Sequence, residues 1–362
     1  MITALALLGY AVCAAWCVPA LLAPLTRRGA SVRAGLAAWL TAMASVLVSV
    51  VVAIEISFRT VAADWPQLTQ ALCRSVAGSA CTPAVYRSAL YEGGTGALAI
   101  LTTLLAAVAL WRYVHRVQHS RRQTRAHAEA ARLVGRALPD GIAAVGAGAP
   151  GAGTTWHRPA AAVVLDDPRP AAYCVAGRPA AIVLTSGALQ VLDPPQLGAV
   201  LAHERAHLAH GDHLLQTLTQ GLAAAFPGVP LFTRGAAEVA RLTEMGADDT
   251  AARTSSRPAL VAALLAIATG TVIPTTGIPG PGLGRGAGAG AAGAGAAGAA
   301  GAAGAVLPSG ALPAAARAVP DRVERLLCPS TPARSAAFTA ALAFALAVLT
   351  AAPLALTLLP TI

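Results

Sequence analysis

Lysine is absent from all 362 residues, so the 26 basic side chains of this chain are all arginine. Charged residues of both signs make up only 12% of the sequence, while hydrophobic residues make up 56%. Soluble globular proteins carry about 25% charged residues. This shortage of charge excludes an ordinary soluble enzyme and indicates a membrane protein.

The six cysteines include no Cys-x-x-Cys pair, the spacing typical of cysteine-based zinc and redox sites. Cys73 and Cys81 lie in one short polar segment, where they can form a disulfide if that segment faces an oxidising space. The other four are expected to be ordinary thiols or core residues.

Four apolar runs are long enough to cross the hydrocarbon core of a bilayer, about 30 Å at about 1.5 Å per helical residue. They cover residues 2–25, 34–56, 96–114 and 336–359. No basic residue precedes the first run, so a cleavable signal peptide is not expected. We therefore expect three spans within residues 1–113, a separate domain over 114–335, and a fourth span within 336–362.

Arginines indicate which ends of these spans face the cytoplasm. Arg27, Arg28 and Arg33 lie between the first two spans. A second group follows the third span: Arg112, Arg116, Arg121, Arg122, Arg125, Arg132 and Arg136. The positive-inside rule places both groups, and hence the 114–335 domain, in the cytoplasm, with both termini and a loop at 57–94 outside. No recognition motif accompanies the net charge of +10, so no nucleic-acid partner is expected.

A His-Glu-x-x-His motif lies between His203 and His207. On an α-helix, residues four apart share a face, so both imidazoles can bind one metal ion. Glu204 lies one residue further round the helix, near enough to polarise a water molecule on the metal without being a ligand. This arrangement predicts hydrolysis of a peptide bond with zinc as the cofactor and Glu204 as the general base.

Three fixed residues in a pentad also arise by chance, on exposed helix faces that bind nothing. The flanking sequence argues against that alternative. Asp193 followed by Pro194 and Pro195 is a helix-start signal, in which a capping carboxylate precedes residues suited to the first turn. An apolar stripe runs beside the histidines: Leu197, Val200, Leu201 and Leu208. A packed helix face that carries these polar groups favours metal binding.

A hydrolytic zinc site takes a third protein ligand, and two candidates are present. Glu244 lies four residues before Asp248 on a predicted helix; Glu244 would complete a His-His-Glu set, and Asp248 would accept the free N–H of a ligand imidazole. His213 is the alternative, because it follows His203 by ten residues as in the metzincins. That pattern needs glycine at position 210, where this chain has histidine, so Glu244 is favoured.

The surroundings of the motif predict a small α+β domain. Residues 160–165 and 181–185 are expected to be strands. The motif helix is expected to run on past His213. An apolar helix over 214–232 is expected to pack against the membrane face or the core of this domain instead of crossing the membrane, and another helix is expected over 259–269. The fold class is therefore a mainly α membrane protein with four transmembrane helices and a cytoplasmic α+β domain.

Two segments rich in glycine and alanine interrupt this domain. Residues 138–155 are expected to be a linker because of this composition. Residues 277–305 are expected to be a disordered insertion, because they cannot bury enough surface to offset the entropy of ordering them. After the insertion, residues 320–327 predict a charged amphipathic helix that contains Arg322 and Arg325.

These features together resemble the integral-membrane gluzincin metallopeptidases. The resemblance rests on the run from Ala181 to Gly187, on the segment that leads into the His-Glu-x-x-His motif, and on the later Glu-x-x-x-Asp pattern, and it covers about residues 163–327. It implies a zincin-type protease domain, with zinc on His203, His207 and Glu244. The strand near 181–185 is then expected to line the substrate cleft, and residues 320–327 to match the family's arginine-bearing segment behind the active site.

The order of three spans, protease domain and fourth span resembles the BlaR-type (beta-lactam sensor-transducer) peptidases more than the HtpX-type or CAAX-protease-like enzymes. The chain ends soon after the fourth span, so the extracellular penicillin-binding domain of those sensors is not expected. The sensor domain acylates through Ser-x-x-Lys, which a chain without lysine cannot contain. Antibiotic sensing is therefore not implied.

The sequence predicts a zinc-dependent membrane endopeptidase. Its expected partners are membrane lipid and a protein substrate, either a cytoplasmic or juxtamembrane segment such as a repressor, or the chain itself. The alternative is a signalling or scaffold protein that keeps the zinc site without turnover. No span carries central ionisable residues, which argues against a transporter. The oligomeric state is not indicated by any pattern in the sequence.

Overall fold

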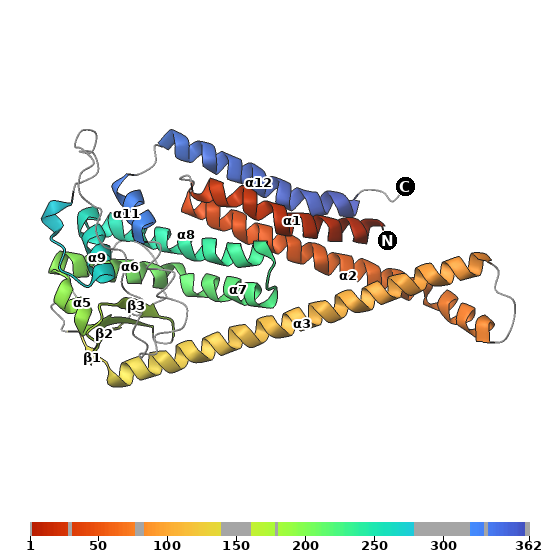
Figure 1. Cartoon of the computed structure of the whole chain (residues 1–362), viewed down its shortest axis with the longest axis horizontal. Coiled ribbons are helices and arrows are strands. Elements are labelled where there is room, and N and C mark those ends of the chain that lie inside the picture. Colours follow the sequence, from red (N-terminus) through yellow and green to blue (C-terminus); the bar gives the residue numbers. More distant parts are fainter. Residues whose placement is uncertain are drawn as a thin grey trace. The chain divides into compact units, whose positions relative to one another are not determined.

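The computed structural model describes residues 2–27, 31–76, 83–138, 161–177, 180–278, 319–328 and 332–358 (Figure 1). Contacts between residues divide the chain into two compact units. The first contains residues 1–118, 216–239 and 332–362, and the second contains residues 119–215 and 240–331.

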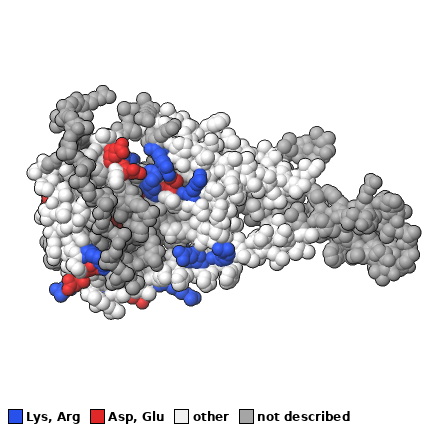
Figure 2. Space-filling view, in the orientation of Figure 1, with Lys and Arg blue, Asp and Glu red and all other residues white. Residues whose placement is uncertain are grey.

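The first unit is built on four long helices: α1 (Ile2–Arg27), α2 (Val32–Val76), α3 (Pro83–Val134) up to residue 118, and α12 (Pro332–Leu358). Each contains a segment long and apolar enough to cross a membrane, namely Ile2–Arg27, Val32–Thr60, Ile100–Val134 and Ser335–Thr357. Uncharged surface dominates the space-filling view of the molecule (Figure 2). The chain is therefore a multi-pass membrane protein, and the four expected spans coincide with helices.

The expected loop over residues 57–94 is wrong for most of its length. Helix α2 continues to Val76, and α3 already begins at Pro83. Just beyond the apolar span, Arg59 pairs with Glu55 one turn earlier at 2.6 Å, which supports the continuing helix. The proposed Cys73–Cys81 disulfide stays a prediction, since Cys81 lies outside the described residues.

Helices α1, α2 and α12 pack against one another through small side chains and the hydroxyl group of Tyr10. Five of the eight buried residues of α1 are small: Ala4, Ala11, Ala14, Ala15 and Thr26. Small residues allow helix backbones to approach closely in a membrane. The Tyr10 hydroxyl lies 3.1 Å from the Ser45 hydroxyl of α2 and donates to the Leu349 carbonyl of α12 at 3.2 Å, so one side chain joins all three helices.

Residues 214–232 form two helices where one was expected. Helix α7 (Asp212–Ala225) ends before a turn in which Gly228 has φ of 82°, and α8 (Pro230–Thr254) begins at the following proline. In the first unit, α8 contacts α2 closely at Gly235, where a side chain would overlap Met43. Glu238 of α8 is buried and accepts from Arg27 of α1 at 2.8 Å.

The second unit contains a four-stranded sheet with the order β1-β2-β4-β3. The strands are β1 (Arg136–Ala137), β2 (Ala161–Leu165), β3 (Ala172–Val175) and β4 (Ala181–Thr185). Strand β2 is parallel to β4, and β3 is antiparallel to it. The two expected strands are β2 and β4, whereas β1 and β3 were not foreseen because neither exceeds four residues.

Strand β3 lies at an edge of the described sheet, whereas β4 lies inside it. Strand β4 pairs on both sides, with β2 and with β3, and all five of its residues are buried. Strand β3 lies at an edge of the described sheet and contacts the motif helix α6 (Pro194–His210). The expectation that residues 181–185 line the cleft is therefore corrected.

Helix α6 begins as the sequence predicts and ends earlier. Asp193 caps it by accepting from the backbone N–H of Gln196 at 2.8 Å, while the Gln196 side chain accepts from the Asp193 N–H. The helix stops at His210, because Gly211 adopts a left-handed conformation with φ of 69°. The expectation that this helix runs past His213 is wrong.

The core of the second unit lies between the sheet and three helices: α5 (Ser186–Val191), α6, and α9 (Arg257–Thr269). Ile182 and Leu184 of β4 and Leu201 of α6 are fully buried there. A short 3-10 turn, η2 (Thr275–Gly277), and α11 (Val319–Leu327) also belong to this unit. So do residues 119–134 of α3, 212–215 of α7 and 240–254 of α8. The expected linker at 138–155 and the Gly-Ala insertion at 277–305 lie almost entirely outside the described residues.

Candidate metal centre

His203 and His207 project from one face of α6, as four-residue spacing on a helix requires. Both are buried, and their rings meet edge to face with centroids 4.6 Å apart. Their Nε2 atoms lie 3.1 Å apart. Two ring nitrogens at this distance cannot both carry a hydrogen between them, so they share one proton or both face a metal ion.

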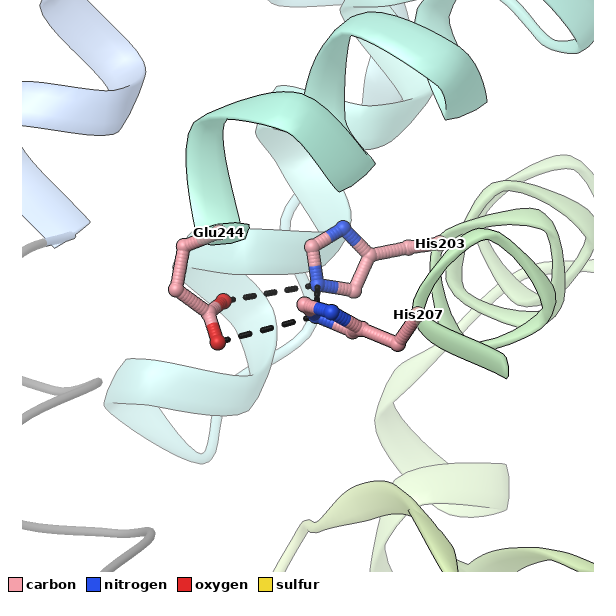
Figure 3. A group of neighbouring side chains, drawn as sticks. All are labelled: His203, His207 and Glu244. Atoms are coloured by element: carbon pink, nitrogen blue, oxygen red, sulfur yellow. Dashed lines mark hydrogen bonds and ion pairs between the residues drawn. The ribbon is translucent and has the colours of Figure 1, made fainter. Parts of the chain in front are cut away.

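Glu244 approaches the two histidines from α8 and completes a group of three (Figure 3). Its Oε2 lies 3.5 Å from His203 Nε2, and its Oε1 lies 3.6 Å from His207 Nε2. Zinc bonds of about 2.0–2.1 Å at tetrahedral angles place ligand atoms about 3.3 Å apart. The three separations of 3.1, 3.5 and 3.6 Å therefore fit the ligand spacing of a zinc ion.

Each of the two histidines has a carboxylate close to its Nδ1 atom, the ring nitrogen that faces away from Glu244. Asp248, one turn after Glu244 on α8, places Oδ1 3.1 Å from His203 Nδ1; the direction of approach makes this an electrostatic contact and not an aligned hydrogen bond. Asp212 lies 2.7 Å from His207 Nδ1. Such carboxylates fix the orientation of a ligand imidazole and leave Nε2 for the metal.

Asp212 was not foreseen from the sequence. It is the first residue of α7, and the left-handed turn at Gly211 brings it back toward His207. The feature of the sequence that could have indicated Asp212 is a carboxylate directly after a glycine, about one turn beyond the His-Glu-x-x-His motif.

Arg322 of α11 joins two acidic residues of α8, Glu244 and Asp248. Its Nε and Nη2 donate to the two oxygens of Asp248 at 2.7 and 2.6 Å, and its Nη1 lies 3.0 Å from Glu244. Arg325 repeats the pattern one turn later, with Asp249 at 2.7 and 2.8 Å. The expected arginine-bearing helix is present, and its paired forks hold the carboxylate side of the site in place.

The charges of the site act together on its pKa values. Burial opposes protonation of His203 and His207, but contacts to Asp248, Asp212 and Glu244 outweigh it, raising the pKa of His203 and bringing that of His207 to about 10. Burial would raise the pKa of Glu244, yet the two histidines and Arg322 hold it well below its usual range. The carboxylate is thus ionised, as a metal ligand must be.

These shifts predict that metal binding releases protons. At pH 7, below the pKa of about 10 of His207, the pair of imidazoles holds a proton that a metal ion must displace from Nε2. We expect about one proton released per metal ion and an affinity that rises as pH rises through the neutral range. Calorimetric zinc titrations in buffers of different ionisation enthalpy measure this number, and an enthalpy independent of the buffer would contradict the prediction.

Glu204 lies on α6 one residue after His203 and is buried. The thiol of Cys174, on the α6 side of edge strand β3, hydrogen-bonds its carboxylate. Burial, reinforced by that negative charge, raises the pKa of the Cys174 thiol, which therefore stays protonated and acts as the donor. The carboxylate of Glu204 is thus placed on the side of α6 that faces the edge strand β3.

His213, the alternative third ligand, is not brought to this group. It lies on α7, is exposed, and is not among the residues whose ligand atoms fall within 4.8 Å of one another. Among the described residues, the group that meets this spacing consists of His203, His207 and Glu244.

Replacing Asp212 with alanine is expected to weaken zinc binding about 10–100-fold, the usual cost of losing a partner behind a ligand. His207 would then lose the acceptor at Nδ1 that orients its ring. His210→Ala is the matched control, because His210 is more exposed and lies 3.9 Å from the same carboxylate. Competition with a chromophoric chelator gives both affinities, and equal losses in the two variants would argue against a role for Asp212.

Comparison with known proteins places this geometry in a family. The sequence model of peptidase family M48 matches residues 142–326, more than half of the chain, and the matched range contains the whole group around Glu244. The chain belongs to peptidase family M48. It is therefore a membrane metallopeptidase by family, and the group of His203, His207 and Glu244 is where the metal on which these peptidases depend would bind.

A protease HtpX homolog of Acidiphilium cryptum (strain JF-5) is 42% identical to this M48 chain over 64 residues. The matched stretch covers 17% of the chain and 22% of the relative, so the chain spans about a fifth of that relative's length. No solved structure matches the chain significantly.

Proposed function

We propose that this M48 peptidase is a zinc-dependent endopeptidase that cleaves protein segments at the membrane. The observation that carries the proposal is the spacing of His203, His207 and Glu244, whose ligand atoms lie within 4.8 Å of one another with Glu204 beside them. Three protein ligands leave a fourth position for water or substrate. A bound zinc ion would lower the pKa of water toward about 7 and polarise a peptide carbonyl.

The protein's own residues then have separate tasks. Glu204 accepts the proton of the attacking water and returns it to the amide nitrogen of the departing peptide. Asp248 and Asp212 keep the Nε2 atoms of the two histidines turned toward the metal. Arg322 neutralises the carboxylates of α8 and holds their positions. The Cys174 thiol donates a hydrogen bond to the Glu204 carboxylate and so helps to orient it.

Strand β3 is the element that would hold the substrate. It lies at an edge of the described sheet and contacts α6, next to Glu204. An extended peptide can add to such an edge through backbone hydrogen bonds, which bind sequence-independently. The proposed substrate is therefore an unfolded or extended protein segment near the membrane, such as a cytoplasmic repressor or a segment of the chain itself.

The orientation in the membrane belongs to the same proposal. The arginines after α1 and along the C-terminal half of α3 favour a cytoplasmic protease domain with both termini outside. The closer likeness to BlaR-type peptidases rests on the order of the spans, whereas the relative reported above is an HtpX homolog. The M48 assignment supports the HtpX-type likeness. The likeness to BlaR-type peptidases, and with it a role in signalling through regulated proteolysis, is proposed from the order of the spans alone.

The experiment that tests the proposal is cleavage of an unstructured protein such as casein by the full chain in lipid nanodiscs. We expect cleavage that 1,10-phenanthroline stops and that added zinc restores. Retention of zinc without cleavage of casein or of the chain itself would favour the alternative, a silent scaffold. Cleavage that survives complete metal removal would overturn the proposal.

A further inference from the structure

The surface of α3 changes character abruptly at Trp111 and Arg112. Before this point the helix exposes large apolar side chains on several sides: Ile100, Leu101, Leu104, Leu105, Val108 and Leu110. Trp111 itself is 66% exposed. A tryptophan at the end of an apolar surface is typical of the boundary between hydrocarbon and headgroups. The boundary of the third span therefore lies near Trp111, well before the helix ends at Val134.

Arginines occupy the exposed surface of α3 directly beyond that boundary. Five of them are exposed: Arg112, Arg116, Arg121, Arg122 and Arg125. None of the five forms an ion pair with any residue that the structure describes, and Glu129 is the nearest acid along the helix. The segment 111–125, named here the basic collar, thus presents uncompensated positive charge next to the membrane surface.

Distance decides which of these arginines can touch lipid. At about 1.5 Å per residue, Arg112 and Arg116 lie within about 8 Å of Trp111 along the helix, and Arg125 lies about 20 Å away. The field of an anionic membrane surface decays over about 8–10 Å at physiological salt. Arg112 and Arg116 are therefore placed for direct contact, while the others add weaker attraction.

We propose that the basic collar of α3 is a binding site for the phosphate headgroups of anionic phospholipids. A guanidinium group matches a phosphate with two parallel hydrogen bonds, and an arginine near the surface contributes about fivefold in affinity for anionic lipid. The collar is continuous with the apolar surface that faces the acyl chains, so one lipid can contact both. This inference concerns α3 alone and does not depend on the proposed peptidase activity.

The test measures which lipids stay with the full chain purified from nanodiscs of equal phosphatidylglycerol and phosphatidylcholine. Co-purified lipids are counted by mass spectrometry. We expect wild type to enrich phosphatidylglycerol over phosphatidylcholine. In the double variant Arg112→Gln with Arg116→Gln, we expect this enrichment to fall about 25-fold. Arg112→Lys with Arg116→Lys should keep most of it, because the charges remain.

The matched control replaces two exposed arginines of α8, Arg234→Gln with Arg253→Gln, and is expected to enrich phosphatidylglycerol like wild type. If the collar double variant does not insert, Arg121→Gln with Arg122→Gln replaces it, with a smaller expected loss. Equal enrichment in wild type and every collar variant would overturn the proposal. Tighter binding of a 20-base-pair DNA duplex, lost in the same variants, would also overturn it in favour of a nucleic-acid site.

Discussion

Glu204→Gln is expected to slow peptide cleavage at least about 100-fold, and up to about 10,000-fold, while the protein keeps its metal. General base catalysis contributes a factor of this size, and the amide cannot accept a proton from water. The variant keeps nearly the same shape, and Glu204 is not among the three clustered ligand residues. Cleavage rates and zinc content measured on one preparation separate the two effects.

Glu324→Gln is the matched control for this variant. Glu324 is an exposed carboxylate of α11 in the same unit, so its replacement removes one charge without touching the site. We expect its cleavage rate to equal that of wild type. Substantial cleavage by the Glu204 variant would rule out this residue as the general base, whereas loss of its zinc would show that it supports the ligands instead.

Glu244→Ala is expected to lose zinc, with a fall in affinity of more than about 100-fold, because removal of a ligand costs more than removal of a residue behind it. Two histidines then remain, and three protein ligands are the usual minimum for a hydrolytic zinc site. Elemental analysis after dialysis against a weak chelator gives the zinc content per chain. Wild type should retain about one ion under the same conditions.

His213→Ala is the decisive comparison, because His213 is the other third ligand that the sequence allows. The structure leaves it exposed on α7 and outside the clustered group, so its zinc content should match wild type. Loss of zinc from His213→Ala with retention in Glu244→Ala would require the site to be redrawn. A wild-type protein without zinc under metal-replete conditions would favour the scaffold alternative.

Local patterns predicted the elements of the site well. The start of α6 follows from Asp193 and its two prolines, and the shared face of the two histidines follows from helical periodicity. Strand β4 and the helix that contains Glu244 were also expected, since each depends on a short run of neighbouring residues. In each case, the residues that determine the element are close neighbours in the sequence.

The predictions that failed concern where helices end and where short strands occur. The end of α6 depends on Gly211 adopting a left-handed conformation. Glycine can adopt helical as well as left-handed backbone, so its presence in the sequence did not by itself fix the end of the helix. The loop expected at 57–94 is largely helix, because the hydropathy pattern marks the limit of a span and not the limit of a helix. Strand β3 is four residues long, too short for an alternating pattern to be recognised.

By itself, the sequence determined that this is a membrane protein and that His203, Glu204 and His207 share one helix, because span length and helical spacing are local properties. Only the tertiary structure decided which distant groups meet them. Asp212 reaches His207 through a turn, Cys174 reaches Glu204 from an edge strand, and Arg322 reaches Asp248 across 74 residues. Such contacts depend on packing between elements, which no local pattern encodes.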